Sequence, residues 1–267
     1  QELSPAAGVL WRPSAGLNAY ANVGTAFQTP TTTELANPED PGSGGGFNRE
    51  LEPQTARNYE IGLRGRIENL VRYEAAAFRT RIDDAINSFE VPGVSGTGRD
   101  FFRNAGRSTR NGVEVMALIR PLADFSARLS YAWSDFTFDR FVTPDGDFSG
   151  NRLPGVPKHK LDLTLSYENN HDVFAEAELL AVGDFFADNA NRSENDAYAR
   201  LDLRAGRTWA SRRWRLRGFF GINNLLDARY NENVRVNAFG GRFFEPAPDR
   251  HAYLGFEIAR LLAQGQR

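Results

Sequence analysis

The feature that most constrains the fold of this chain is a two-residue alternation of apolar and polar side chains within residues 213–260. The alternating apolar positions include Trp214, Leu216, Phe220 and Ile222 in one segment and Ala252, Leu254, Phe256 and Ile258 in the next. A period of two is that of a β-strand whose two faces meet different surroundings. Neither segment has the i, i+3, i+4 recurrence of an amphipathic helix. The two segments therefore predict long strands joined by a long connection.

The same alternation recurs along the chain and predicts about eleven strands. Before the two C-terminal segments, the predicted strands are Leu3–Trp11, Leu17–Phe27, Thr55–Ile67, Val71–Phe89, Asp100–Arg120, Phe125–Phe138, Lys158–Glu168, Val173–Ala187 and Asp196–Trp209. Several exceed the roughly 5–6 residues usual in soluble sheets. They reach the roughly 9–11 residues that a tilted strand needs to cross a bilayer.

The connections between these strands alternate between short turns and long loops. The short turns lie near 12–16, 68–70, 121–124, 169–172 and 210–213, and the long loops near 28–53, 90–99, 139–157, 187–195 and 226–248. In an up-and-down meander alternate connections lie at opposite ends of the sheet. Outer-membrane barrels have short periplasmic turns and long extracellular loops. We therefore predict an antiparallel transmembrane β-barrel portion, in preference to a β-sandwich, with its apolar face toward lipid.

The composition excludes several classes of protein. The longest unbroken apolar run, Val115–Ile119, is far shorter than the roughly 18 residues of a membrane-spanning helix. A formal net charge of −2 indicates no nucleic-acid partner. Because the chain has no cysteine, it has no disulfide framework and no thiol nucleophile.

No catalytic, metal or cofactor motif stands out. The three histidines, His159, His171 and His251, are far apart at predicted strand ends or turns and are interpreted as solvated rim residues. Neither a nucleotide-binding glycine motif nor a nucleophile elbow is present. A membrane lipase would need a nucleophile–base pair, and nothing in the sequence singles one out. We expect no enzyme, no cofactor and no metal site.

Six stretches resemble the C-terminal part of TonB-dependent outer-membrane receptors, and together they cover nearly the whole chain. They are GTAFQTPTTTEL (24–35), LEPQTARNYEIGLRG (51–65), FFRNAGRSTRNGVEV (101–115), RLPGVPKHKLDL (152–163), GINNLLDARY (221–230) and RFFEPAPDRHAYLGFEI (242–258). The stretch 101–115 and the loop before it are most similar to ferric-citrate-type receptors and to a related group that includes a pyrroloquinoline quinone receptor.

The resemblance implies that residues 1–267 are one incomplete domain, the C-terminal part of a 22-stranded barrel. Its eleven strands would be numbers twelve to twenty-two, and the plug domain would lie outside this chain. Such barrels usually end on an aromatic residue, whereas this chain continues through Ala259-Arg260-Leu261 to Arg267.

The function implied by the resemblance is active uptake across the bacterial outer membrane of a ferric siderophore or a similar small anionic nutrient. The expected partners are outer-membrane lipid, a small-molecule ligand and the TonB complex, which would be reached through the plug. Two alternatives stay open. One is a passive porin-like or structural barrel, and the other is a receptor for a non-iron ligand such as pyrroloquinoline quinone.

The candidate ligand-binding residues lie in or beside the predicted long loops. Arginine pairs with carboxylates through its planar fork, and aromatic rings offer stacking surfaces. The candidates are Arg99, Arg103, Arg152, Arg235, Arg242, Phe27, Phe239 and Phe243. The alternative for each is an ordinary rim residue. The acidic loop residues Glu39, Asp40, Asp145 and Asp147 are alternative contacts for divalent cations or lipopolysaccharide.

Overall fold

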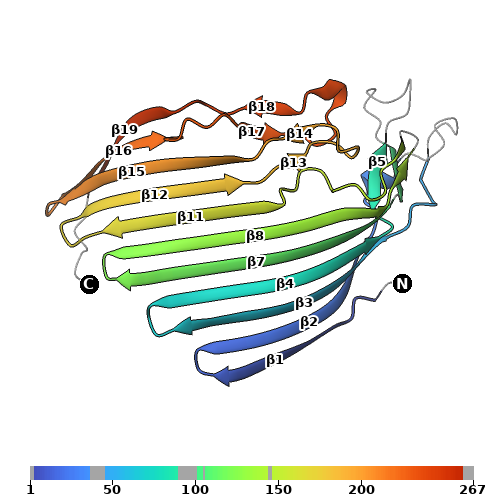
Figure 1. The fold of residues 1–267 in the computed structure, drawn as a ribbon, viewed down its shortest axis with the longest axis horizontal. Helices are drawn as coiled ribbons and strands as arrows, with labels where there is room; N and C mark the ends of the chain where they lie inside the picture. The colour runs from blue at the N-terminus through green and yellow to red at the C-terminus, as the bar shows by residue number, and fades with distance from the viewer. Residues whose placement is uncertain (1–2, 37–45, 90–100, 105, 144–145, 261–267) are drawn as a thin grey trace.

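A computed structural model describes residues 3–36, 46–89, 101–104, 106–143 and 146–260, and it is dominated by one antiparallel sheet of 11 strands (Figure 1). In sheet order the strands are β1 (Ala6–Ser14), β2 (Leu17–Gln28), β3 (Gln54–Ile67), β4 (Val71–Asp83), β7 (Arg107–Leu122), β8 (Phe125–Arg140), β11 (His159–Glu168), β12 (Val173–Val182), β15 (Tyr198–Ala210), β16 (Trp214–Asn223) and β19 (His251–Arg260). Each strand pairs with its neighbours in chain order, which confirms the predicted meander. In these ranges no helix is long and apolar enough to cross a membrane.

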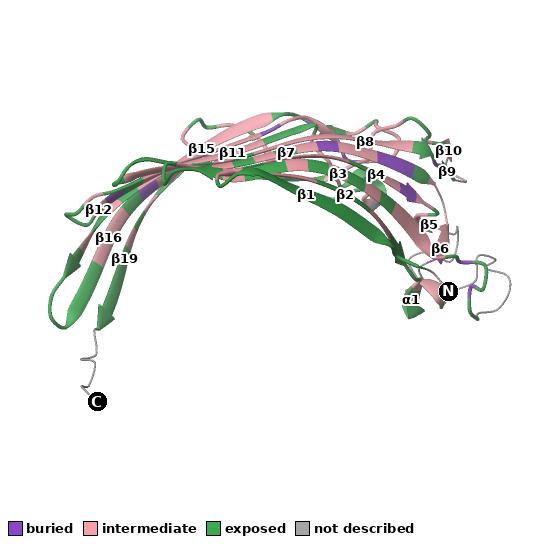
Figure 2. Ribbon diagram, turned by 90° about the horizontal axis from the view of Figure 1, so that it is seen from below, coloured by how far each residue is buried: buried purple, intermediate pink, exposed green. Residues whose placement is uncertain are grey.

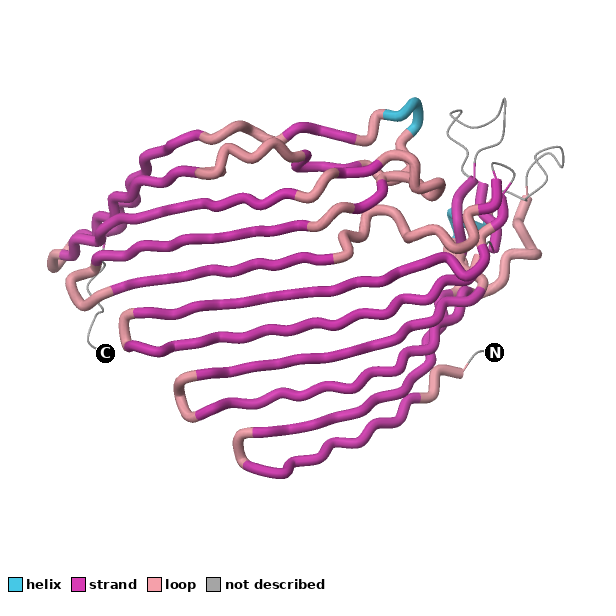
Figure 3. The backbone as a smooth tube through the Cα atoms, viewed as in Figure 1, coloured by secondary structure: helices cyan, strands magenta, loops and turns pink. Residues whose placement is uncertain are grey.

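The connections at one end of the sheet are tight, and those at the other end carry small elements of their own (Figure 3). The two-stranded ribbons are β5 (Ile86–Phe89) with β6 (Phe101–Asn104), β9 (Val142–Thr143) with β10 (Gly146–Asp147), β13 (Phe185–Phe186) with β14 (Glu194–Asn195), and β17 (Asn231–Val234) with β18 (Phe244–Pro246). Helix α1 (Thr32–Leu35) and the 3-10 turn η2 (Phe239–Gly241) belong to the same end. The alternation of short turns and long loops is therefore confirmed.

The sheet is a single curved layer (Figure 2). On β19, Leu254, Phe256 and Ile258 are 67%, 68% and 70% exposed, although they are large and apolar. Their pairing partners on β16 continue the same row, with Leu216 opposite Ile258. We call this side of the sheet the apolar face and the opposite side the polar face. In the described part of the chain no second sheet covers the apolar face, so the predicted preference over a sandwich is confirmed.

Glycines on the polar face lie beneath aromatic rings of neighbouring strands. A Cβ atom on Gly62 would be 2.3 Å from Cζ of Tyr20, and one on Gly221 would be 2.3 Å from Cζ of Tyr253. Only a residue without a side chain permits such a close approach. The rings therefore lie flat across the sheet and keep the space above it open.

Two predicted turns were placed too early, at 12–16 and 121–124. Strand β1 continues to Ser14 and β7 to Leu122, and in both the pairing register shifts around a proline, Pro13 or Pro121. Proline has no N–H to donate to the ladder, so a strand accommodates it at an edge or a bulge. The prolines thus interrupt the pairing locally without ending the strand.

Three predicted strands were too long. The segment predicted as Val71–Phe89 divides into β4 and β5 around Asp84, whose φ is 55°. The segment predicted as Asp100–Arg120 divides into β6 and β7 before Arg107, where Gly106 has a φ of 97°. Positive φ values turn the backbone out of the extended conformation. The segment predicted as 173–187 likewise divides into β12 and β13.

Candidate functional site: the polar face and the interlocked loops

The polar face of β12 and β15 carries a ladder of opposite charges. Arg204 Nη2 lies 3.1 Å from Glu176 Oε1 on the neighbouring strand, and Arg200 Nε lies 3.0 Å from Asp202 Oδ2. Arg200 also lies 3.8 Å from Glu178. These side chains share a face because alternate residues of a strand point the same way. On this part of the polar face, which we call the wall, positive and negative charges are nearly balanced and there is no large apolar patch.

A phenylalanine ring is held among the arginines of this wall. The guanidinium carbon of Arg217 lies 4.1 Å from the ring centroid of Phe174, and that of Arg204 lies 5.9 Å from it. The ring is only 8% exposed. It lies above Gly206, where an added Cβ would be 2.8 Å from the ring. Cations above an aromatic face are attracted by its quadrupole, so Phe174 joins three strands at one point.

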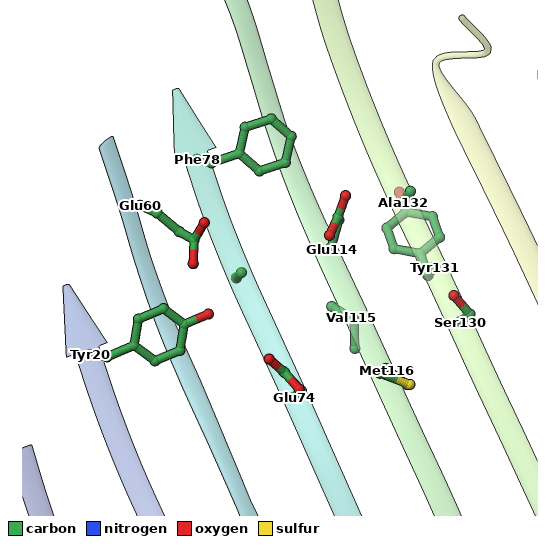
Figure 4. A pocket seen from close by; sticks show the side chains of 11 residues that line it. Tyr20, Glu60, Glu74, Phe78, Glu114, Val115, Met116, Ser130, Tyr131 and Ala132 are labelled. Atoms are coloured by element: carbon green, nitrogen blue, oxygen red, sulfur yellow. The ribbon is translucent and has the colours of Figure 1, made fainter. Parts of the chain in front are cut away.

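A hollow of about 460 Å³ lies farther along the polar face, over β2, β3, β4, β7 and β8 (Figure 4). The side chains of Tyr20, Glu60 and Glu74 extend into it from three successive strands, and Glu114 lies beyond them. In the described residues no group of three His, Cys, Asp or Glu side chains has the geometry to hold a metal ion. Because Glu60, Glu74 and Glu114 line it, the hollow is an acidic recess in the polar face.

Three of the long connections are locked together by asparagine side chains. Asn191 accepts a 2.8 Å hydrogen bond from the backbone N–H of Arg152 and donates a 2.9 Å bond to its carbonyl. Asn151 donates to the carbonyl of Asn189, whose N–H donates to the side chain of Asn237. The connections after β8, β12 and β16 thus form one hydrogen-bonded unit at the loop end.

Arg152 is the best-anchored of the candidate residues in this unit. Its Nη1 lies 3.0 Å from Oδ2 of Asp184, and its guanidinium carbon lies 5.4 Å from the ring centroid of Phe186. The hydrogen bond from Arg152 holds the pKa of Asp184 below its usual range, more strongly than desolvation raises it. Arg152 therefore serves to hold two loops together, and its charge is already partly neutralised.

We expect Arg152→Ala to loosen this loop unit without unfolding the sheet. The backbone N–H of Gly155, which donates to the carbonyl of Phe186, should exchange with solvent roughly fivefold faster, because a partly exposed ion pair contributes up to about 1 kcal/mol. Hydrogen exchange measured by mass spectrometry would detect the change. Arg235→Ala, which removes the separate pair with Glu245, is the control and should leave this exchange rate unchanged.

The same contact gives the loop unit a pH dependence of known sign. Because the pKa of Asp184 is lower in the folded protein than in the unfolded chain, the contact is fully present above the unfolded pKa of roughly 3.9. It is lost as the pH falls through the folded value. The protection factor of the Gly155 amide, which is its intrinsic exchange rate divided by the observed rate at the same pH, should therefore fall in that acidic range in the wild type and change little in Arg152→Ala; an equal fall in both would contradict the assignment.

The other candidates are placed apart from one another. Arg235 pairs with Glu245 at 2.6 Å across the β17–β18 ribbon. Arg242 is exposed beyond that ribbon, and Phe243 lies next to Phe244 with ring centroids 5.9 Å apart. Arg103 lies on β6 and is partly buried. Residues outside the described part are Arg99, the side chain of Phe239, Glu39, Asp40 and Asp145.

Phe27 lies on the apolar face. It pairs with Thr55, in the register that places Val23 opposite Tyr59 four residues away. By the two-residue period its ring therefore lies on the same side as these residues and opposite to the polar wall. Its proposed role as a stacking surface for ligand stays a prediction, and this position does not favour it.

The sequence did not single out the asparagines that fix the loop ends to the sheet. Asn224 is 1% exposed, has a φ of 52°, and accepts and donates hydrogen bonds with the backbone of Ala228. Asn104 bonds both the N–H and the carbonyl of Glu52 through its side chain. Both asparagines lie within the resemblance motifs, FFRNAG and GINNLLD. A signal was therefore available, and the hydrogen bonds of these residues fix the geometry of the loops.

The geometry defines a class of protein. A single-layered antiparallel sheet with an accessible apolar face, a charged opposite face and elaborated connections at one end is a portion of the wall of a transmembrane β-barrel. Closing such a wall on itself would remove its edges and place the charged face in the lumen.

The chain belongs to the family described as TonB dependent receptor-like, beta-barrel, whose model matches residues 1–225. This is a family of transport receptors of the bacterial outer membrane. The metal-pseudopaline receptor CntO of Pseudomonas aeruginosa is 25% identical over 246 residues, covering 88% of this chain and 31% of the relative.

Solved structures show the same fold. The siderophore receptor PiuA of Acinetobacter baumannii superposes with a TM-score of 0.74 at 20% identity, over 96% of this chain and 35% of that one. The ferric-catecholate import receptor Fiu of E. coli K12 gives a TM-score of 0.72 at 21% identity, over 96% and 34%. The chain spans about a third of the length of these relatives.

Proposed function

We propose that this chain is part of a receptor that takes up a ferric siderophore or a similar small anionic nutrient across the outer membrane, driven by the TonB complex. The observation that carries the proposal is the barrel wall itself, with its charged lumenal face and its hydrogen-bonded outer loops, in a family of TonB-dependent receptors. Relatives named for metal–pseudopaline and ferric–catecholate uptake favour a metal chelate as the cargo.

We further propose that residues 1–267 are the C-terminal part of a larger barrel with 22 strands and a plug. The proposal is supported by the coverage of only about a third of the relatives. It is also supported by the sheet, in which β1 pairs with β2 and β19 with β16 as the two edges of the described strands. An exposed edge is prone to pair with another strand, so closure with further strands is favoured.

Transport by cells that express the full-length protein tests the function. In a strain without other receptors for the tested chelates, we expect accumulation of radioactive iron from a ferric siderophore that stops when TonB is deleted or the proton gradient is collapsed. Accumulation that is independent of TonB would instead indicate a passive porin. Uptake of pyrroloquinoline quinone without iron uptake would indicate the non-iron alternative.

A panel of chelates identifies the ligand class. Anionic carboxylate and catecholate complexes should be taken up in preference to a neutral chelate of similar size, because arginines are available among the described loop residues. Arg242→Gln is the sharpest single variant, since this side chain is exposed at the loop end. It should raise the KM for an anionic chelate and leave TonB dependence intact.

A further inference from the structure

The apolar face ends, at the loop side of β3, β4 and β7, in a group of arginines that we call the outer arginine cluster. Its members are Arg57 on β3, Arg79 and Arg81 on β4, and Arg107 at the start of β7. In the register Arg57 is directly opposite Arg81, and Tyr59 is directly opposite Arg79. Arg57, Arg79 and Arg107 are exposed, and Arg81 is half-buried.

The cluster lies immediately beyond the lipid-facing band. On β3 the alternate residues after Arg57 are Tyr59, Ile61, Leu63 and, at the strand end, Ile67. The stretch from Tyr59 to Ile67 is roughly 27 Å long at the rise of a β-strand. At a strand tilt of about 40° it covers roughly 21 Å of the height of the apolar band, which is about 25 Å tall in an outer-membrane barrel. Tyr59 therefore marks the outer interface, and the arginines lie at the level of the lipid head groups.

The positive charges of the cluster are not balanced on the protein. Asp83 lies 2.6 Å from Arg107 Nε and 3.6 Å from Arg81 Nε. In the described residues Arg57 and Arg79 form no ion pair, and the buried Nε of Arg81 has no hydrogen-bond partner. Like charges directly opposite each other destabilise a strand pair. Because Asp83 is shared by Arg81 and Arg107, an anion from outside the chain would stabilise the remaining arginines, Arg57 and Arg79.

Two carboxylates of β8 on this face, Asp135 and Asp139, lie beyond β7 and do not pair with Arg57 or Arg79. Asn111 lies between Arg79 and Asp135 in the register, so β7 separates the two charges. Asp139 accepts a 2.8 Å hydrogen bond from the hydroxyl of Thr109. The positive field on β3 and β4 thus remains open toward the membrane.

We propose that the outer arginine cluster binds the phosphate groups of phosphorylated lipids in the outer leaflet. A guanidinium pairs with phosphate through two parallel hydrogen bonds. Basic groups at the membrane surface attract anionic head groups. Tyr59 and Phe27 on the same face supply aromatic contact at the interface. The bound lipid would fix how deeply β3 and β4 sit in the membrane. It would also hold the loop ends of β3, β4 and β7 at the membrane surface.

The test measures binding of lipid A with two phosphates to the full-length protein in detergent, with dephosphorylated lipid A as the comparison. The cluster variant carries Arg57→Gln, Arg79→Gln and Arg81→Gln. The matched control carries Arg64→Gln, Arg66→Gln and Arg72→Gln, which remove the same charge from the polar face of the same strands, including the cross-strand pair of Arg66 with Arg72.

We expect the cluster variant to bind phosphorylated lipid A at least tenfold more weakly than the wild type, and the control to bind it normally. The wild type should prefer the phosphorylated lipid over the dephosphorylated one. Equal binding of both lipids, or normal binding by the cluster variant, would overturn the proposal. Arg79→Gln alone, which removes one arginine without an ion pair in the described residues, should weaken binding about threefold and covers the case in which the triple variant does not assemble. Inorganic phosphate should compete only weakly; full competition would mean that the site recognises free phosphate and would overturn the lipid assignment.

Discussion

Leu63→Arg is expected to destabilise the protein in a bilayer by about 2–4 kcal/mol, the cost of an arginine at the midplane of a barrel's lipid face. Leu63 is 46% exposed and lies between Ile61 and Gly65 on β3, in the middle of the apolar row that begins at Tyr59. The long side chain of an arginine at this depth has farthest to reach before its charge meets water. Guanidinium unfolding of the full-length protein in phospholipid vesicles, followed by tryptophan fluorescence, gives the free energy.

The matched control places the same residue on the opposite face of the neighbouring strand. Ala76 on β4 pairs with Gly62 and Glu114, and it lines the acidic hollow. Ala76→Arg should change the free energy of unfolding by less than about 1 kcal/mol, because its charge lies among carboxylates in the lumen. Equal losses for Leu63→Arg and Ala76→Arg would contradict the assignment of the two faces.

Phe174→Ala is expected to destabilise the protein by about 3 kcal/mol, within the range for large-to-small changes of buried aromatic residues. The ring is 8% exposed, and its faces and edges meet Arg217, Arg204 and the backbone at Gly206. Its loss would leave a void on the polar wall and remove the shared partner of two arginines. The same unfolding experiment in vesicles measures the effect.

A double-mutant cycle separates the arginine contact from packing. Phe174→Ala and Arg217→Gln should be non-additive by about 1 kcal/mol or more, because the guanidinium carbon lies 4.1 Å from the ring centroid. Replacing each ring by leucine gives a second comparison, in which Phe219 is the control. The ring of Phe219 lies on the same face above Gly255, and its ring partner is Tyr253. Phe174→Leu should cost about 1 kcal/mol more than Phe219→Leu. Additivity within about 0.5 kcal/mol would show that Arg217 contributes nothing through the ring.

The charge ladder and the interlocked loops bear on the proposed uptake of a ligand. Arg200 and Arg204 are paired with acids on the same face, so the charges on this part of the polar face largely cancel. The loops after β8, β12 and β16 are held to one another by Asn151, Asn191 and Asn237. A ligand arriving from outside would therefore meet a preorganised surface, which lowers the entropy cost of binding.

The sequence alone determined the fold class, the order of the strands and the end at which the loops lie. These follow from local rules: a period of two places Leu254, Phe256 and Ile258 on one face, and the lengths of the connections separate the two ends of a meander. The family could also be recognised, because motifs such as GINNLLDARY cover residues with fixed backbone roles. Asn224, with its positive φ and its bonds to Ala228, is one of these.

The tertiary structure alone decided which charges have partners. Arg152 was a candidate for ligand binding, and its contact with Asp184 depends on two loops that are distant in sequence meeting at the end of the sheet. The pairing of Arg57 with Arg81 likewise depends on the register between β3 and β4, and a shift of one residue would put these side chains on opposite faces. Charge pairing is a property of distances across strands and loops, whereas alternation is a property of the chain itself, and for that reason only the latter could be read from the sequence.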